Sequence, residues 1–447
     1  MTAPTRDPRL GPDLRPEVHP HRRRERGAAL LTVLLVVAVL TALAVELAYQ
    51  TRVSLQLAAN SRDELKASYQ ARSALALSRL VLHFQQRLDA ASGVAAQALS
   101  RPGPGGAAAP TAPSFSFRLW EVVPVDSATT ALFLGSSGRE AMRDAAPHRS
   151  GDGTPTAGGA RPAPPPVGTE ESFQARIEDE ERKVNVAQLA GLSAVAGPQL
   201  QRFLLATRDP RFDVLFDRED SNGNRFARRD VAAAFKDWVD EDGTTSAVGD
   251  KPAVPFEEGF SDENFAYDRG DDRYKAKNAR FDSLDELFLV NGVSDAFMAA
   301  FGDQLTVYPD VNAATNINTA DPEQMMVNVL LMSDPPGVPQ APVLDPTFPQ
   351  KLEIGLRLAR PLPFMTISVQ QFATLLQTLG VRVQPLFLQA VNTDARSPFG
   401  NRSSTFTIRA SGRAGAVERT IEAVVTVDGR AGGLATDLGR VIHWREE

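Results

Sequence analysis

The sequence of 447 residues contains no cysteine and only five histidines. Without cysteine the fold cannot use disulfide bonds, so any stabilisation beyond packing has to come from a bound metal. Among the histidines only His19 and His21 lie close together in the sequence, so a zinc site is not expected. The formal net charge of −7 disfavours a nucleic-acid partner.

Motifs of common enzyme classes are also missing. The sequence has no cysteine nucleophile, no Gly-x-Ser-x-Gly turn, no His-Glu-x-x-His zinc motif and no phosphate-binding loop. Acidic residues are plentiful, but in loops with the spacing of metal ligands they bind ions more often than they transfer protons. We therefore expect that the chain is not an enzyme. An anchored enzyme of the periplasm or the outer surface is the alternative.

A long apolar run near the N-terminus is what the chain does have. Residues 28–45 carry no charge, and Glu46 follows them. These 18 residues would form a helix of about 27 Å, close to the thickness of bilayer hydrocarbon. Arg22–Arg24 precede the run, and such a basic flank keeps the N-terminal stub cytoplasmic while the rest crosses the membrane. A secretory signal would have a shorter apolar core, of about 7–15 residues.

The junction between the basic stub and the apolar run resembles the class III leader of type IV pilins and pseudopilins. Arg24 and Gly27 match its Arg-x-x-Gly pattern, and the apolar run follows directly. In that family a prepilin peptidase cuts after the glycine and methylates the new N-terminus. The resemblance implies cleavage between Gly27 and Ala28, a leader at residues 1–27 and a transmembrane helix at 28–48. A plain signal anchor without cleavage is the alternative.

Position 32 departs from most of that family. Its members usually carry a glutamate five residues after the cut, which pairs with the N-terminus of a neighbouring subunit, whereas this chain has Thr32. A buried charge without its partner costs several kcal/mol, so a subunit of this kind fits best at an end of the filament. The K subunit of the type II secretion system departs at the same position, and residues 26–37 are similar to its start.

This resemblance implies a function and a location. The chain would be a minor pseudopilin at the tip of the type II secretion pseudopilus, starting filament assembly and supporting protein export across the outer membrane. Its partners would be the minor pseudopilins I and J, the major pseudopilin, the prepilin peptidase and the inner membrane, with no nucleic acid. It would be a single-pass protein of the bacterial inner membrane with its C-terminal bulk in the periplasm. A minor pilin of a type IV pilus and a membrane-anchored competence protein are the alternatives.

The pattern of the remaining chain predicts an α+β fold. From Glu46 to about Arg87 there is no proline or glycine, and apolar residues recur at helical spacing. We expect this long helix to pack on an antiparallel sheet, as in pilins; a coiled-coil spacer is the alternative. Strands are predicted at residues 114–120, at 173–178 and in a hairpin at 405–427. Residues 49–187 would supply the helix and the first strands, with flexible Pro/Gly-rich linkers at residues 101–113 and 151–166. Residues 351–447 would supply the rest of the sheet.

Residues 188–350 are predicted to form an inserted, all-helical domain. Two helices joined by a glycine-containing turn at residues 284–301 resemble helix-hairpin-helix and sterile-alpha-motif-like folds, although a plain interhelical turn fits as well. The segments 274–287 and 316–323 are again similar to the K subunit.

Two acidic loops inside this insertion have the spacing of calcium ligands. One contains Asp220, Asn222 and Asn224, and the other contains Asp240 and Asp242. Oxygen ligands at positions 1, 3 and 5 of a turn can converge on calcium, although neither loop is an EF-hand. A solvated acidic surface is the alternative for both.

The second loop also resembles a segment near which family members bind calcium. Residues 237–242 are similar to the Asp-Trp-x-Asp-x-Asp motif of the family, and residues 263–267 to its Glu-Asp-x-x-Tyr motif, with Asn264 in place of the aspartate. An amide oxygen ligates calcium without contributing charge, so affinity should be lower than in the family. The ligands implied are Asp237, Asp240, Asp242, Glu263 and Asn264.

Overall fold

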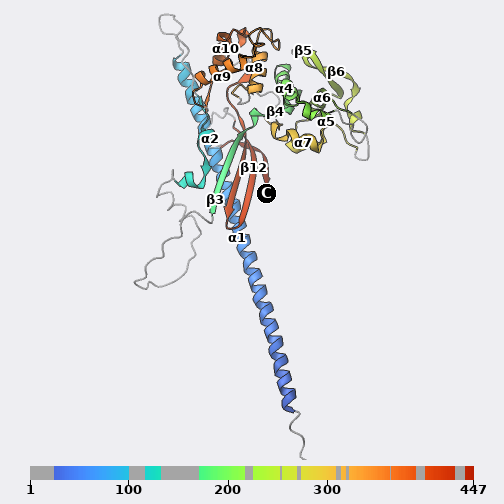
Figure 1. The fold of residues 1–447 in the computed structure, drawn as a ribbon, viewed down its shortest axis with the longest axis vertical. Coiled ribbons are helices and arrows are strands. Elements are labelled where there is room, and N and C mark those ends of the chain that lie inside the picture. Colours follow the sequence, from blue (N-terminus) through green and yellow to red (C-terminus); the bar gives the residue numbers. More distant parts are fainter. Residues whose placement is uncertain are drawn as a thin grey trace, which may run out of the picture. The chain divides into compact units, whose positions relative to one another are not determined.

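Figure 1 shows the fold of the chain in a computed structural model. The structure describes residues 25–99, 116–131, 171–216, 225–251, 254–268, 273–308, 314–318, 322–362, 364–388, 398–427 and 438–447. The predictions for leader residues 1–24, for both Pro/Gly-rich linkers and for the loop at residues 220–224 lie outside these residues. The chain divides into two units, Met1–Asp63 and Glu64–Glu447.

The first unit contains the beginning of the long helix α1, Glu25–Leu99. The uncharged stretch of residues 28–45 is exposed throughout. Within the described residues, the part of α1 from Ala28 to Asp89 is long and apolar enough to cross a membrane, by length and composition. The hydroxyl of Thr32 donates to the carbonyl of Ala28 at 3.1 Å. The polar group of Thr32 is therefore satisfied within its own helix.

The second unit is built around a five-stranded sheet, one face of which is covered by the later part of α1 (Figure 1). Ala67, Ala71 and Ala74 are fully buried in this contact, and their small side chains let the helix approach the strands closely. Gly412 has no room for a Cβ, because the backbone of α1 at Ala67 and Ala71 lies in its place. The neighbouring strands are, in order, β13 (Arg440–Glu446), β12 (Val417–Thr426), β11 (Thr405–Ala414), β3 (Glu171–Asp179) and β2 (Val125–Asp126).

The pairing of these strands is antiparallel throughout. β11 and β12 form the predicted hairpin, whose turn contains Gly415 with a φ of 58°. β11 also pairs with β3, so the late strands join an early strand as predicted, and residues 180–404 are an insertion between two strands of one sheet. The predicted α+β class, with a long helix packed on an antiparallel sheet, is confirmed.

The predicted strand at residues 114–120 differs from the structure. Ser116–Phe117 form the short strand β1, which pairs with β9 (Met365–Thr366) outside the main sheet. The chain then turns into helix α2 (Leu119–Val122). Trp120 packs edge-on against Phe406, with 5.5 Å between ring centroids. The apolar alternation at this place therefore serves a contact between a helix and the sheet.

The first core of the insertion gathers aromatic side chains from three helices. Phe203, Phe235 and Phe297 are buried, with 5.8 to 6.5 Å between their ring centroids. The helical elements of this part are η2 (Val186–Ala190), α4 (Ser193–Ala206), η3 (Pro210–Phe212), α5 (Asp213–Phe216), α6 (Arg228–Val239), η4 (Glu263–Ala266), η5 (Leu284–Leu289), α7 (Asp295–Phe301) and η6 (Gly302–Gln304).

A β-hairpin interrupts these helices. β5 (Thr244–Lys251) and β6 (Val254–Asp262) pair in an antiparallel manner directly after α6. The prediction of an all-helical insertion is therefore wrong at residues 244–262. The β-branched residues Thr244 and Thr245 favour extended backbone at this place.

The second core of the insertion continues beyond residue 350. Phe348, Leu352 and Phe372 are buried in one cluster. The helices that supply this cluster are α8 (Pro322–Met332), α9 (Phe348–Ala359), α10 (Val369–Thr378) and α11 (Pro385–Leu388). Because these helices bury their apolar faces against one another, the sheet does not resume at residue 351 as predicted, but only at Thr405.

Two short parallel pairs lie near the ends of the insertion. β4 (Val184–Asn185) pairs with β7 (Leu305–Thr306), and β8 (Thr315–Asn316) pairs with β10 (Phe399–Gly400). The 3₁₀ turn η1 (Glu180–Arg182) connects β3 to the first of these strands.

Candidate metal centre

A cluster of three carboxylates lies at the end of α6. Asp237 belongs to the last turn of this helix, Asp240 follows its last residue, and Glu263 begins η4. One ligand oxygen from each of the three lies within 4.8 Å of the others. Asp237 and Glu263 are buried, and Asp240 is half-buried.

The hairpin brings these acids together from distant points of the sequence. The apolar face of α6 is buried through Val231, Phe235 and Trp238, which fixes the helix and its C-terminal acids against the first core. β5 and β6 then lead the chain away and back, with Thr244 opposite Asp262. The structure thereby returns Glu263 to the end of α6.

Some oxygens of the cluster have donors. The backbone N–H of Ser246 donates to Oδ1 of Asp237 at 2.9 Å. The ammonium group of Lys236 donates to Oδ2 of Asp240 and, at 2.8 Å, to the hydroxyl of Ser246. One ammonium group therefore stands beside three carboxylates.

Other oxygens at the same place are buried without a donor. They are Oδ1 of Asp240, both carboxylate oxygens of Glu263 and Oδ1 of Asn278. When Asp240 and Glu263 are ionised, all of these oxygens are hydrogen-bond acceptors and cannot satisfy one another, and a buried acceptor without a donor is costly. A cation would satisfy all of them at once.

Asn278 is the residue that the ligand prediction missed. Its side-chain N–H donates to the backbone carbonyl of Asp242 at 2.8 Å, which leaves its amide oxygen without a donor. Its backbone has a φ of 49°, in the left-handed region that asparagine tolerates better than most residues. The segment 274–287 attracted notice only for its similarity to the K subunit, and nothing in its spacing relates Asn278 to Asp240.

The electrostatics of the cluster favour a bound cation. Burial raises the pKa of Glu263 to about 7, and the negative charges of Asp237, Asp240 and Asp242 contribute to this rise. The amide side chain of Asn278 acts in the opposite direction and lowers the pKa. Burial also raises the pKa of Asp237 to about 6. Carboxylates so placed resist ionising together, and a divalent cation would remove that resistance.

The remaining predicted ligands lie elsewhere in the same region. The carboxylate of Asp242 is exposed and accepts from both the N–H and the hydroxyl of Thr244 at 2.9 Å. The amide oxygen of Asn264 accepts from the N–H of Ala276 at 3.2 Å. The structure therefore brings Asp237, Asp240 and Glu263 together but turns the amide oxygen of Asn264 to the backbone.

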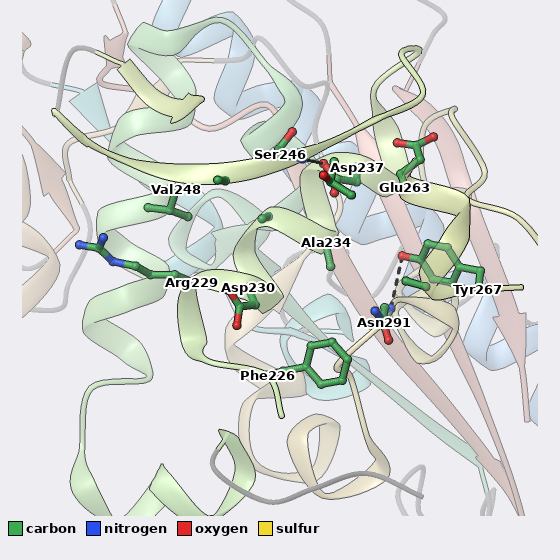
Figure 2. A pocket seen from close by; sticks show the side chains of 14 residues that line it. Phe226, Arg229, Asp230, Ala234, Asp237, Ser246, Val248, Glu263, Tyr267 and Asn291 are labelled. Atoms are coloured by element: carbon green, nitrogen blue, oxygen red, sulfur yellow. Dashed lines mark hydrogen bonds between the residues drawn. The ribbon is translucent and has the colours of Figure 1, made fainter. Parts of the chain in front are cut away.

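A cavity of about 330 Å³ adjoins the cluster. Figure 2 shows Asp237 and Glu263 towards one end of this cavity and Arg229 towards the other. Tyr267 also lines it, and its ring lies 5.5 Å from that of Trp238 between centroids. These aromatic rings cover one side of the carboxylates with apolar surface.

The donor set fits a hard divalent cation. It consists of carboxylate and amide oxygens, with no histidine or sulfur ligand among the residues of the cluster. Calcium takes six to eight oxygen ligands of this kind, whereas zinc and copper favour nitrogen and sulfur. Asp237, Asp240, Glu263 and Asn278 are the side chains placed to hold such an ion.

The processing residues lie at the start of α1. Gly27 and Ala28 both fall within the helix, with Ala28 as the first residue of the uncharged stretch, and Thr32 lies one turn further on. Cleavage between Gly27 and Ala28 remains a prediction.

Comparisons with known proteins give a similarity among solved structures only. The chain matches no protein-family model and none of the curated proteins. Among solved structures it is similar to a chain in the crystal structure of the GspK-GspI-GspJ complex from the type 2 secretion system of enterotoxigenic Escherichia coli. The match covers 65% of this chain and 84% of that chain, with 15% sequence identity and a TM-score of 0.36.

Proposed function

We propose that the chain is a minor pseudopilin of a type II secretion system, similar to the K subunit. It would act at the tip of the pseudopilus, start filament assembly and support protein export across the outer membrane. The observation that carries this proposal is α1. Its uncharged stretch begins directly after Gly27, and its later part packs on an antiparallel sheet through Ala67, Ala71 and Ala74.

Position 32 supports a place at the end of the filament. The hydroxyl of Thr32 donates within its own helix, to Ala28 and to Ala29, and it carries no charge. It therefore offers nothing to neutralise the N-terminal ammonium of a neighbouring subunit. A charge left unpaired in an apolar filament core would cost several kcal/mol for each subunit.

The insertion supports the same place. Residues 180–404 leave the sheet between β3 and β11 and form two apolar cores of their own. A subunit inside a filament shaft would have to accommodate this mass between its neighbours, whereas a subunit at the tip would not. We propose the minor pseudopilins I and J as direct partners, with the major pseudopilin below them.

Membrane insertion and processing follow from the same proposal. Residues 28–48 would span the bacterial inner membrane once, with the C-terminal bulk in the periplasm. The prepilin peptidase would cut between Gly27 and Ala28 and methylate the new N-terminus.

Calcium is the proposed ligand of the carboxylate cluster. Asp237, Asp240 and Glu263 would supply charged oxygens and Asn278 a neutral one. When bound, the ion would supply positive charge that joins the end of α6 to the returning end of the hairpin. Its role would be to stabilise the fold of the insertion.

The intact mass of the protein from native membranes tests the function most directly. We expect a chain that begins at Ala28 and carries one methyl group. Gly27→Val should leave an uncut precursor, because the peptidase must accommodate a residue without a side chain before the cut. Ala29→Val, which places the same side chain two residues away, is the control and should be processed. A protein that retains Met1 or begins elsewhere would contradict the proposal.

The tip position has a separate test. The chain should be present at about one copy per filament, and it should form a complex with the I and J subunits without polymerising alone. Quantification in sheared filaments, after expression with and without these partners, measures both. Filaments made mostly of this chain would refute the tip position even if processing occurs as expected.

A further inference from the structure

One edge of the main sheet is only partly paired. β3 pairs with β11 along all of its residues, from Glu171 to Asp179. On its other side β2 pairs only with Gln174 and Ala175. In the described part of the chain no further strand pairs with this side of β3. Among the described residues, the backbone of β3 beyond Ala175 therefore has an unpaired edge, and such an edge is a template for another extended chain.

A hollow lies beside this free edge. Its volume is about 480 Å³, and it is lined by residues 120–125 and by β3 from Ala175 to Ile177. Trp120, Val122 and Ile177 give it apolar walls, and the side chain of Val122 is half exposed there. The hollow thus has room for the side chains of a strand added along β3.

The charged residues that line the hollow are two arginines and one glutamate, although the chain as a whole is acidic. Arg176 and Arg182 line it and are exposed. The only acid in its lining is Glu121, whose carboxylate accepts from the guanidinium of Arg118 at 2.6 Å. Arg176 forms an ion pair with Glu178 at 3.1 Å, with most of its side chain in contact with solvent. Electrostatic complementarity therefore favours an acidic occupant.

We propose that the free edge of β3 binds an extended, acidic segment of a partner polypeptide as an added strand. Backbone hydrogen bonds beyond Ala175 supply affinity, as in other cases of strand addition. Alternate side chains of the segment fill the apolar hollow, and its carboxylates lie beside Arg176 and Arg182. This binding does not depend on the proposed role in secretion.

Short peptides test the proposal on the full chain in detergent micelles. The probes are acetylated, dye-labelled peptides of seven residues that alternate valine with glutamate or valine with lysine, measured by fluorescence anisotropy. We expect the glutamate peptide to bind at least tenfold more tightly than the lysine peptide. A glutamate peptide that is N-methylated at every backbone nitrogen should lose this binding, because it has no backbone N–H donor on either edge.

Matched variants of the chain assign the binding to this edge. Arg182→Glu should weaken binding of the glutamate peptide at least tenfold, and Arg176→Glu provides a second, independent change. Arg413→Glu alters the charge equally on β11, an inner strand of the same sheet, and should leave binding unchanged. The proposal is overturned if no peptide binds, if the lysine or N-methylated peptide binds as tightly, or if Arg413→Glu has the same effect as Arg182→Glu.

Discussion

The acidic turn at residues 179–181 and the acidic cluster around Glu263 both bury carboxylates, but the donors around them differ. In the turn each carboxylate accepts hydrogen bonds from the protein itself. Oδ2 of Asp179 accepts from the hydroxyl of Ser403 at 2.6 Å. Oε1 of Glu180 accepts from the hydroxyl of Thr407 at 2.6 Å and from the ammonium group of Lys183 at 2.7 Å. Oε1 of Glu181 accepts from the N–H of Ser404 at 2.6 Å and from its hydroxyl at 2.9 Å.

The cluster lacks such donors. Both carboxylate oxygens of Glu263 and one of Asp240 are buried without a hydrogen-bond partner. The difference shows that a high density of acids does not by itself indicate a metal site. The supply of donors separates a structural turn, in which each carboxylate has donors within the chain, from a cluster whose unpartnered oxygens fit a cation.

Calcium should therefore have the largest effect, and only on the cluster. We expect calcium to raise the melting temperature of the full chain in detergent and a chelator to lower it. Saturation at about a hundred times the dissociation constant corresponds to about 2.7 kcal/mol. Glu263→Gln should remove this response. Asp250→Asn is the control, because Asp250 is exposed at the far end of the hairpin. Equal melting with calcium and chelator, together with no metal in elemental analysis, would contradict the assignment.

The turn should respond to pH and not to calcium. Burial and repulsion from Asp179 raise the pKa of Glu181, and burial raises the pKa of Asp179. A carboxyl group with a raised pKa in the folded state binds protons more tightly there than in the unfolded state. Its contribution to stability is thus complete at low pH and is lost as the pH rises from about 4.5 to about 8.

Glu181→Gln should flatten this dependence. The glutamine can still accept from Ser404, but it carries no charge, so the variant should be more stable than the parent at pH 8. Each unit of raised pKa corresponds to about 1.4 kcal/mol. Chemical denaturation at pH 5 and pH 8, in the presence of chelator, measures the difference. A variant with the same pH dependence as the parent would show that the turn does not carry this charge penalty.

Removal of one donor should make the turn resemble the cluster. Thr407→Val deletes the hydroxyl that donates to Glu180 and keeps a similar shape, which leaves a buried carboxylate with fewer donors. We expect a loss of about 1–3 kcal/mol in the free energy of unfolding. Thr420→Val on β12 is the control, because the hydroxyl of Thr420 has no such carboxylate partner among the interactions of the described residues. Equal losses in both variants would indicate an effect of strand packing alone.

The sequence predicted the parts of the molecule that depend on local pattern. The long helix was predicted from the uncharged apolar stretch of residues 28–45 and from the helical spacing of apolar residues after Glu46. The hairpin of β11 and β12 was predicted from the alternation of apolar and polar residues on both sides of Gly415. The β5–β6 hairpin was missed, because short extended runs among acids are decided by tertiary packing. The helices α9 and α10 were missed although their apolar residues recur at helical spacing.

The site was predicted where its ligands are close in sequence. Asp237 and Asp240 lie on one short segment, and Glu263 was added through a resemblance. Asn264 stays a predicted ligand, and the structure adds a contact that its spacing does not predict, from the N–H of Ala276 to its amide oxygen. Asn278 was missed, since its left-handed backbone and its contact with Asp242 cannot be read from spacing.

Asn278 gives the smallest and most specific test of the comparison. Asn278→Gly keeps a backbone that is suited to a φ of 49° but removes the amide oxygen, so calcium affinity should fall about tenfold, equivalent to about 1.4 kcal/mol. Asn278→Asp supplies a charged oxygen and should bind calcium more tightly while lowering stability in chelator, because it adds a fourth carboxylate. Calcium titrations followed by tryptophan fluorescence report both changes, since Trp238 lies next to Asp237 in α6. Unchanged affinity in both variants would remove Asn278 from the ligand set and leave the cluster with three acids.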